Sequence, residues 1–318
     1  MRPSSGHAER GQLEPRHLWV QAESIVRISR VVSDLERSES FYRTALGFRS
    51  LTRAAPDPEV LSALGLPGAG ATEVRMRLGS EELALLRFES VPRNYPADSQ
   101  SNDLWFQHLA IVVSDMDAAY GHLRASVHWR PISTDGPETL PASSGGVRAF
   151  KFRDPDGHPL ELLWLPPRSG RPLWHGARRA DALEPPFLGI DHSALAVSST
   201  RRSLAFYRAL GLHVVARSMN TGPAQSRLDA LNAVRVRVTG LRPASVEGPG
   251  VELLAYRPPG RARNSSTVTD LSTDWITLSA ITAGGAGTSL PRTRALIDPD
   301  GHRVVLKSQR GGSFGRPA

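Results

Sequence analysis

The sequence predicts an α+β protein built from four repeated βαβββ modules, of which the fourth is degenerate. Three observations support this prediction. The turn Asp154-Pro-Asp-Gly-His158 returns as Asp298-Pro-Asp-Gly-His302, and an apolar strand follows each turn. The helical segments 40–47 (SFYRTALG) and 203–211 (SLAFYRALG) are close copies of one another. Recurrence of such elements at intervals of about 80 residues is typical of a repeated structural unit.

The first module is predicted from a change of periodicity along the chain. The β-branched-rich segment 25–32 predicts a strand, and Ser33-Asp34 then predicts a helix N-cap. The amphipathic pattern of 35–46 predicts a helix that ends before Gly47. Three further strands complete the module, at 48–53, 72–78 and 81–88.

The second module repeats this order and contains a carboxylate in an apolar strand. We expect a strand at 105–113, a helix at 116–125 and, after a Pro-, Gly- and Ser-rich loop, a hairpin over 150–165. In the turn of this hairpin, Pro sets φ, Gly takes a positive φ and Asp caps backbone N–H groups. The closing strand is apolar except for Glu161, and a charge in such a strand is costly unless it is paired or bound to a metal.

The third module is as complete as the second, whereas the fourth is shortened. The third has a strand at 189–197, a helix at 201–210 and closing strands at 234–239 and 250–256. The fourth has a strand at 274–281, a short segment 283–287 in place of the helix, and a hairpin at 294–307.

From these modules we predict two domains joined by a linker. The N-terminal domain would span 23–166 (modules 23–98 and 103–166), and the C-terminal domain 187–308 (modules 187–258 and 272–308). The Pro-, Gly- and Arg-rich segment 167–186 would connect them. Residues 1–22 and 309–318 are expected to form a flexible lead-in and a flexible tail.

The composition of the chain indicates which compartment, partners and metal ligands to expect. The chain has 318 residues, 40% of them hydrophobic, and no run near the roughly 18 apolar residues of a membrane span, so we expect no membrane partner. The polar N-terminus lacks the apolar core of a signal peptide, so we expect a cytoplasmic protein. Because there is no cysteine, any metal must bind nitrogen and oxygen ligands.

The net charge of +8 does not by itself predict a nucleic-acid partner. Lysine occurs only at 151 and 307, and the arginines are scattered along the chain or gathered in Pro- and Gly-rich segments. No zinc-finger, helix-turn-helix or RNA-recognition motif accompanies them. We therefore expect a small-molecule substrate and no nucleic acid as the main partner.

These features resemble the vicinal oxygen chelate (VOC) superfamily, which includes glyoxalase I, methylmalonyl-CoA epimerase, extradiol dioxygenases and bleomycin-resistance-type binders. The motifs that carry the resemblance are 108–115 (HLAIVVSD), the two similar helices and both Asp-Pro-Asp-Gly-His turns, and it covers roughly residues 24–308. It implies modules paired into two cupped mixed sheets. It also implies up to two metal ligands per module, one near the start of the first strand and one early in the last strand.

Only the middle modules keep residues of ligand type at these two positions. Alignment on the Ser-Asp cap and on the closing strand gives His108 and Glu161 in the second module and His192 and Glu252 in the third. The corresponding residues of the outer modules offer no usual metal ligand; they are Arg27 and Ala84 in the first module and Leu278 and Val305 in the fourth.

The pairing of the modules decides whether these four residues meet. Pairing the first with the second and the third with the fourth, as in extradiol dioxygenases, would leave two ligands per site, usually too few for a tight catalytic ion. Pairing the second with the third and the first with the fourth, as in single-chain four-module glyoxalases, gathers all four in one site. We predict the latter. A domain-swapped dimer would gather them equally well, so a monomer and a homodimer both stay open.

The resemblance implies a divalent cation, Zn, Ni, Co, Mn or Fe(II), bound by His108, Glu161, His192 and Glu252. Such an ion would act as a Lewis acid on neighbouring oxygens of a small substrate and stabilise an enediolate, with Glu161 or Glu252 as the catalytic base. This is the chemistry of a glyoxalase-like lyase, isomerase or epimerase. If one glutamate stays off the metal, the remaining His-His-Glu triad would suit an extradiol-type Fe(II) dioxygenase. A non-catalytic binding or bleomycin-resistance-type protein is a third possibility.

Each of these residues also has a purely structural alternative. A single histidine near the start of a strand is more often hydrogen-bonded than a ligand, but two His and two Glu at equivalent positions favour a metal. Glu252 is the least secure, because a slip of its strand by one residue would turn it to solvent. His158 and His302 are predicted to be surface residues of their turns, and whether Lys151 faces the site or water stays open.

Overall fold

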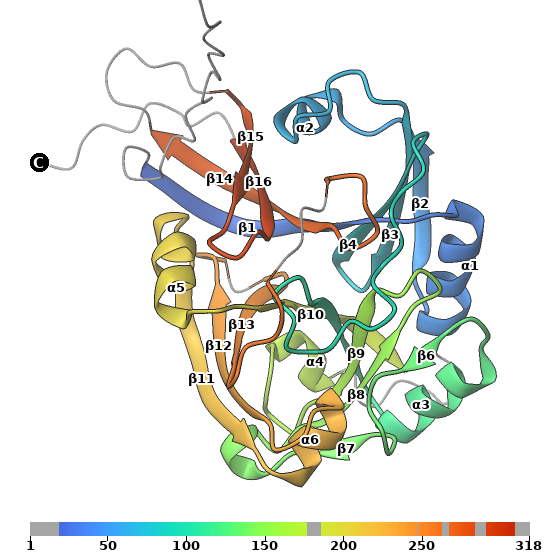
Figure 1. Cartoon of the computed structure of the whole chain (residues 1–318), viewed down its shortest axis with the longest axis vertical. Helices are drawn as coiled ribbons and strands as arrows, with labels where there is room; N and C mark the ends of the chain where they lie inside the picture. The colour runs from blue at the N-terminus through green and yellow to red at the C-terminus, as the bar shows by residue number, and fades with distance from the viewer. Residues whose placement is uncertain (1–18, 177–185, 246, 263–266, 284–290, 309–318) are drawn as a thin grey trace, which may run out of the picture.

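The computed structural model describes residues 19–176, 186–245, 247–262, 267–283 and 291–308. It is an α+β structure with two mixed sheets, which confirms the predicted fold class. In Figure 1 the first and last parts of the chain, in blue and red, form the upper sheet, and the green and orange middle parts form the lower one. No helix in these ranges has the length and apolar character needed to cross a bilayer.

The elements follow the order expected for repeated modules. The first module consists of β1 (Trp19–Val31), α1 (Leu35–Leu46), β2 (Arg49–Ala54), α2 (Pro58–Ala63), β3 (Ala71–Leu78) and β4 (Glu81–Phe88). The second consists of β5 (Gln107–Val113), α3 (Met116–Ala125), β6 (Arg130–Pro131), β7 (Glu138–Thr139), the 3-10 turn η2 (Ala142–Ser144), β8 (Arg148–Arg153) and β9 (Pro159–Trp164).

The third and fourth modules follow a short helix, α4 (Pro172–Gly176). The third consists of β10 (Phe187–Ala196), α5 (Thr200–Ala209), β11 (His213–Thr221), α6 (Pro223–Asp229), β12 (Arg235–Arg242) and β13 (Gly250–Tyr256). The fourth consists of β14 (Asp274–Ala283), β15 (Thr293–Ile297) and β16 (Arg303–Ser308).

Strand order confirms the predicted pairing of the modules. The seven-stranded sheet runs β15-β16-β14-β1-β4-β3-β2 and joins the first module to the fourth. The nine-stranded sheet contains β11-β12-β13-β10-β5-β9-β8-β6, with β7 on β8, and joins the second to the third. At the centre of each sheet the first strands of the two modules lie antiparallel, β1 on β14 and β5 on β10. The nine-stranded sheet therefore brings both candidate ligand pairs together within one chain.

Two segments differ from their predicted boundaries. β1 begins at Trp19, inside the predicted lead-in, because Val20 and Ala22 are buried and alternate with polar residues. In the predicted linker 167–186, Arg171 is buried and bonded to Glu81, and Trp174 is packed in an apolar cluster. The remaining residues of the lead-in, the linker and the tail (1–18, 177–185 and 309–318), and most of the segment that replaces the fourth helix (284–287), lie outside the described residues. The domain bounds themselves stay a prediction.

The two repeated turns connect one sheet to the other. Asp156 accepts a hydrogen bond from the backbone N–H of Ser33 at 3.0 Å, and Asp300 accepts the equivalent bond from Ser198 at 3.0 Å. Each turn of an even-numbered module thus holds the helix cap of the module before it. The prediction that His158 and His302 lie at the surface is wrong, since each is only 1% exposed. The turns are inserted between modules, so their histidines are buried at the contact.

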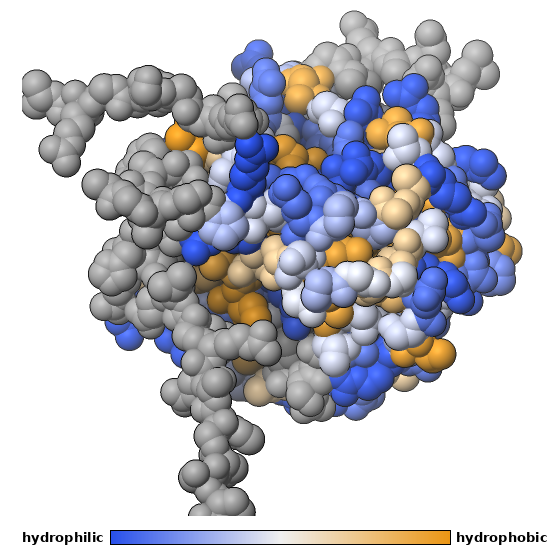
Figure 2. All heavy atoms as spheres, turned by 90° about the horizontal axis from the view of Figure 1, so that it is seen from above, coloured by the Kyte–Doolittle hydropathy of each residue, from blue (hydrophilic) through white to orange (hydrophobic). Residues whose placement is uncertain are grey.

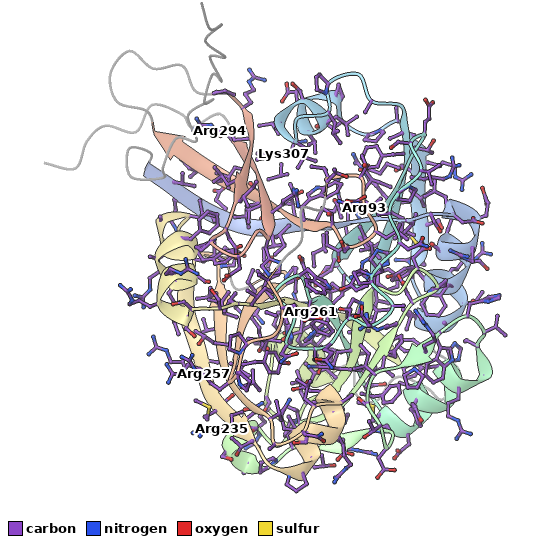
Figure 3. The ribbon with its side chains drawn as sticks, viewed as in Figure 1. Arg93, Arg235, Arg257, Arg261, Arg294 and Lys307 are labelled. Carbon is purple, nitrogen blue, oxygen red and sulfur yellow. The ribbon has the colours of Figure 1, made fainter. Side chains whose placement is uncertain are left out.

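Charged residues are distributed over the described surface. The basic residues labelled in Figure 3 come from several elements, with Arg235 beside Arg257 and Arg294 close to Lys307; the other two are Arg93 and Arg261. Three of them bond carboxylates, namely Asp270, Asp103 and Asp57. The face shown in Figure 2 is mainly hydrophilic, with hydrophobic residues in small groups. The absence of a nucleic-acid partner stays a prediction.

Candidate metal centre

A cavity of about 160 Å³ lies on one face of the nine-stranded sheet, between the second and third modules. Its apolar wall comes from both modules and consists of Leu140, Val147, Leu163, Leu165, Leu228, Val236, Val238 and Leu254. All four predicted ligands, His108, Glu161, His192 and Glu252, line it together. The structure therefore brings together every residue that the sequence singled out for the site.

Strand register explains why these side chains share one face. In the antiparallel pair of first strands, His108 lies opposite Ala194, and Ala110 lies opposite His192. In each module the closing strand runs parallel to the first strand, and Glu161 pairs with Ala110 while Glu252 pairs with Ala194. Because side chains alternate along a strand, both histidines and both glutamates project from the same side.

Three of the four side chains form a tight group. Oε2 of Glu161 lies 3.2 Å from Nε2 of His108 and 3.9 Å from Nε2 of His192. Atoms of ligand type from these three residues all lie within 4.8 Å of one another, and the three residues are buried. Glu252 lies at the side, with Oε2 at 3.4 Å from Nε2 of His192 and 29% of its side chain exposed.

The histidine nitrogens that face this group have no hydrogen-bond partner. Nε2 of His108 and Nε2 of His192 are both buried and unpartnered among the described residues. Their nearest acidic neighbours are Oε2 of Glu161, 3.2 Å from Nε2 of His108, and Oε2 of Glu252, 3.4 Å from Nε2 of His192. Buried polar atoms normally have a partner, because leaving one unsatisfied costs about 1–3 kcal/mol.

The surroundings shift the pKa values of the four groups in different directions. Burial lowers the pKa of His108 to about 4. Burial would also lower the pKa of His192, but the carboxylates of Glu252 and Asp191 outweigh it and raise that pKa to about 9. Burial opposes ionisation of Glu161, yet His108 and Lys151 outweigh it and lower the pKa of Glu161 to about 2. Burial and the neighbouring Asp191 raise the pKa of Glu252.

Comparison with known proteins identifies the fold and the family. A family model described as the glyoxalase/bleomycin resistance protein/dioxygenase superfamily matches residues 24–162, which is the length of the first two modules. Glyoxalase I from Zea mays has a similar fold, with a TM-score of 0.54, 17% identity, and coverage of 92% of this chain and 94% of that one. The first two modules thus match the vicinal oxygen chelate superfamily, and the whole chain shares the fold of glyoxalase I.

Two further structures share the four-module VOC fold. A variant of the Zea mays glyoxalase I gives a TM-score of 0.58 at 17% identity, covering 92% of this chain and 94% of that one. A putative dioxygenase from Bacillus subtilis subsp. subtilis str. 168 gives 0.52 at 12% identity, covering 92% and 87%. Comparison with curated protein sequences gave no match. At these identities the neighbours establish the fold and leave the reaction to be argued from the site.

Asp191 is a residue of this VOC site that the sequence did not single out. Nδ1 of His192 donates to Oδ2 of Asp191 at 2.8 Å, and Arg242 donates to the other carboxylate oxygen at 3.0 Å. Such a carboxylate orients an imidazole and makes its other nitrogen a better ligand. The hint in the sequence was that Asp191 directly precedes His192. Neighbouring residues of a strand normally face opposite sides of the sheet, so the strand pattern predicted that Asp191 points away from the site.

Lys151 faces the cavity, which answers the question left open by the sequence. It is 3% exposed, lies opposite Glu161 in the sheet, and donates to Oδ1 of Asp229 at 2.7 Å. Oδ2 of Asp229 accepts from Gln225, whose side-chain oxygen accepts in turn from Asn220. Asn220, Gln225 and Asp229 come from β11 and α6, and Asn220 and Gln225 line the cavity together with Lys151. The sequence did not indicate these hydrogen bonds, because Lys151 and its partners lie far apart along the chain.

Among the described residues, the equivalent face of the seven-stranded sheet holds no such group of ligands. Ala84 and Val305, at the glutamate positions, belong to an apolar cluster with Tyr95 and Trp105. Arg27 lies between the carboxylates of Glu73 and Glu82, at 3.7 and 3.5 Å. In the fourth module the register places Trp275 at the histidine position, so the predicted Leu278 is wrong by three residues. In the outer pair of modules, apolar and ion-paired side chains occupy the positions that correspond to the candidate metal centre.

Proposed function

We propose that this protein is a metal-dependent VOC enzyme that moves a proton on a small oxygenated substrate, in the manner of a glyoxalase-like lyase, isomerase or epimerase. The convergence of His108, Glu161, His192 and Glu252 on one cavity carries the proposal. The Nε2 atoms of His108 and His192, which have no hydrogen-bond partner among the described residues, lie within 3.4 Å of a glutamate carboxylate. A cation there would satisfy both nitrogens.

The donor set fits a divalent ion of the first transition row. Two neutral imidazoles and two carboxylates balance a charge of +2, and Zn, Ni, Co, Mn and Fe(II) all accept nitrogen and oxygen ligands. When bound, such an ion supplies Lewis-acid polarisation of substrate oxygens. His108, Glu161 and His192 would hold it, since their ligand atoms lie within 4.8 Å of one another. Asp191 would keep the His192 ring in its orientation.

The two glutamates have different surroundings, which suggests different roles. Glu161 is 6% exposed, lies close to both histidines and stays ionised, as expected of a permanent ligand. Glu252 approaches only His192, is partly open to the cavity, and has a raised pKa. A carboxylate whose pKa is raised towards neutrality can accept and return a proton. We therefore assign the general base to Glu252.

Cavity size limits the substrate. The volume of about 160 Å³ lies below the roughly 300 Å³ at the lower end of ordinary ligand pockets. The leucine and valine wall favours an apolar substituent, while Oδ1 of Asn220, which has no partner among the described residues, can bind a polar one. The proposed substrate is a compact molecule with two neighbouring oxygens.

Hydrogen exchange tests the proposed proton transfer directly. Wild-type protein loaded with each of the five metals would be incubated in D₂O with small α-hydroxy ketones and α-hydroxy acids, and deuterium at the carbon next to the carbonyl followed by NMR. We expect metal-dependent exchange with at least one compound. Glu252→Gln should abolish the exchange while keeping the metal. If no compound exchanges, or if one binds without reaction and without metal, the protein is a binder and the proposal fails.

A second candidate is an Fe(II) dioxygenase, and the grouping of ligands favours it specifically. The tight group contains two histidines and one carboxylate, without Glu252. This is the donor set of the facial triad in non-haem Fe(II) oxygenases. Oxygen uptake by the Fe(II)-loaded protein with simple catechols tests this alternative. Uptake that persists in Glu252→Gln would support the dioxygenase, and no uptake with any catechol would exclude it.

A further inference from the structure

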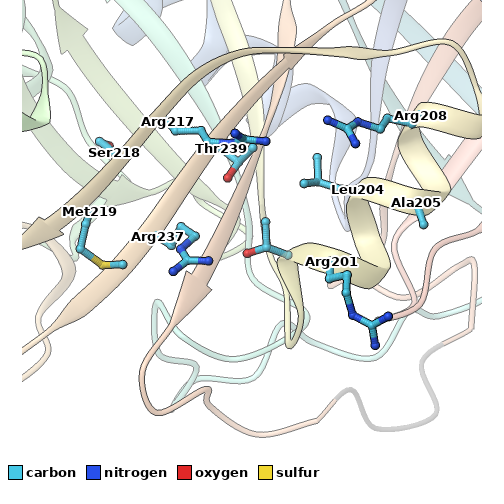
Figure 4. A pocket seen from close by; sticks show the side chains of 10 residues that line it. Arg201, Leu204, Ala205, Arg208, Arg217, Ser218, Met219, Arg237 and Thr239 are labelled. Atoms are coloured by element: carbon cyan, nitrogen blue, oxygen red, sulfur yellow. The ribbon is translucent and has the colours of Figure 1, made fainter.

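A second, larger hollow lies outside the candidate metal centre, between helix α5 and strands β11 and β12. Its volume is about 790 Å³, and it is lined by Thr200, Arg201, Leu204, Ala205, Arg208, Arg217, Ser218, Met219, Arg237 and Thr239. In Figure 4 the guanidinium groups of Arg208 and Arg217 point towards one another across the hollow, and Arg201 turns away from it. Of the described residues, four arginines and no acidic residue line the hollow.

Regular secondary structure places these side chains. On the helix, Arg201, Leu204 and Arg208 lie three to four residues apart and so share a face. In the sheet, Arg217 pairs with Thr239 and Met219 pairs with Arg237 across β11 and β12. The two strand arginines are therefore diagonal neighbours on the side facing the helix. The basic hollow is built on rigid elements.

The equivalent positions of the first and second modules can be compared with this hollow. In the first module the second residue after the helix N-cap is Glu36, which pairs with Arg53 of β2. In the second module the same position is Asp117, which pairs with Arg148 of β8. In each case an acidic residue of the helix neutralises an arginine of the sheet.

The third module reverses this charge. The second residue after its N-cap, Ser199, is Arg201. The third module keeps the arginine of the sheet. Arg217 lies six residues after Gly211, which is the position of Arg53 relative to Gly47. Glu39, which also contacts Arg53, is replaced by Leu204 at the same helical position. The third module thus keeps the cation and has lost both carboxylates.

The groups of this hollow are left without partners. Within the described ranges, none of Arg201, Arg208, Arg217 and Arg237 has an ion pair or a side-chain hydrogen bond. Thr239 is fully buried, yet its hydroxyl has no hydrogen-bond partner there either. Like charges that face one another without counter-ions are unfavourable. An anion in the hollow would relieve the repulsion and could bond the hydroxyl.

We propose that this hollow binds the phosphate groups of a small organic molecule of nucleotide size. Planar guanidinium groups match phosphate oxygens in pairs of hydrogen bonds. The volume lies within the roughly 300–1,000 Å³ typical of ligand pockets, more than a lone phosphate needs. Leu204, Ala205 and Met219 give the floor an apolar part for the organic portion of the ligand. The inference is independent of whether the cavity on the other face binds a metal.

Calorimetric titration of the full chain with pyrophosphate and with ADP at low salt tests the site. We expect both to bind, and ADP more tightly because of the apolar floor. Arg201 itself points away from the hollow, but the equivalent Glu36 of the first module pairs with the arginine of the sheet. Arg201→Glu should therefore keep the fold, neutralise Arg217 and weaken both ligands at least about tenfold. Arg217→Glu should do the same. Arg43→Glu is the control, since Arg43 is the exposed residue of α1 that corresponds to Arg208; it changes the net charge equally and should alter binding less than about twofold.

Three results would overturn the proposal. Neither anion binds, although the melting temperature shows folded protein. Arg43→Glu weakens binding as much as Arg201→Glu, which would mean that net charge alone attracts the ligand. A short single-stranded DNA displaces ADP at lower concentration than pyrophosphate does, which would mean that the hollow serves a nucleic acid.

Discussion

Asp191 and His192 are adjacent in a β-strand, yet both side chains line the same cavity and are joined by a 2.8 Å hydrogen bond. A shift of register between Ile190 and His192 in the pairing of β10 with β5 accounts for this. At such a bulge one residue is left out of the ladder, and its side chain is turned out of the usual alternation. In the other histidine, His108, Nδ1 has no hydrogen-bond partner in the described part of the chain. The two proposed metal ligands are therefore supported unequally.

Loss of the Asp191 carboxylate should weaken the metal centre. In Asp191→Asn we expect metal affinity to fall by about 10- to 100-fold, the usual effect of removing a residue that orients a ligand histidine. Competition with a metal-binding dye measures this directly. Far-UV circular dichroism should show an unchanged fold. Wild-type affinity in this variant would mean that His192 needs no support, or that it does not bind the metal.

Metal binding should release about one proton near pH 7.5. Without a cation, the pKa of His192 is raised to about 9 and that of His108 is lowered to about 4, so only His192 carries a proton there. An imidazole must lose its proton to bind a metal, so apparent affinity should rise up to about tenfold per pH unit as pH increases towards 9. Titration calorimetry in two buffers of different ionisation enthalpy counts the proton. An affinity independent of pH between 7 and 9 would contradict this assignment.

The two glutamates should contribute unequally to metal binding. Glu161 is close to both histidines, so Glu161→Gln should lower the affinity by about 100-fold or more. Glu252 lies at the side of the group, and Glu252→Gln should lower it by about tenfold or less. The pair of isosteric variants controls for the loss of one charge. Equal losses would show that Glu252 is as firm a ligand as Glu161.

Arg30 is fully buried where the two sheets meet, and its loss should destabilise the protein. It donates to Asp274 at 2.7 Å and to the hydroxyl of Tyr42 at 2.7 Å, and it lies 3.7 Å from Asp154. Arg30→Ala leaves buried carboxylates without their cation, which costs about 3–5 kcal/mol of unfolding free energy.

Urea denaturation of a matched pair measures that cost. In the control Arg53→Ala, a side chain 44% exposed loses its pair with Glu36, and the change should stay below about 1 kcal/mol. Similar values for the two variants would mean that Arg30 contributes no more than a surface pair does.

The overall architecture could be predicted because the modules repeat local signals. The N-caps at Asp34 and Asp115 and the stop at Gly47 are contained within single elements, and the structure has a helix after each cap. The module pairing followed from the positions of His108, Glu161, His192 and Glu252, since only one pairing lets them meet. The requirement that these four residues meet therefore identified which modules pair.

Residues whose roles depend on distant partners could not be predicted. Lys151 is paired with Asp229, 78 residues away, and the burial of His158 depends on the turn lying against the first module. Asp191 needed a local bulge that the alternation of the strand conceals. The histidine position of the fourth module was misplaced because that module has no helix cap from which to count back.

Elemental analysis of the purified protein tests the central claim most directly. The four proposed ligands meet in the nine-stranded sheet, and the equivalent positions of the outer modules hold no residue of ligand type, so we predict one divalent ion per chain. The double variant His108→Ala/His192→Ala should retain less than about a tenth of it, while His213→Ala, which removes an exposed histidine of β11, should retain all of it. Protein that binds no divalent ion, or a double variant with full metal content, would contradict the account.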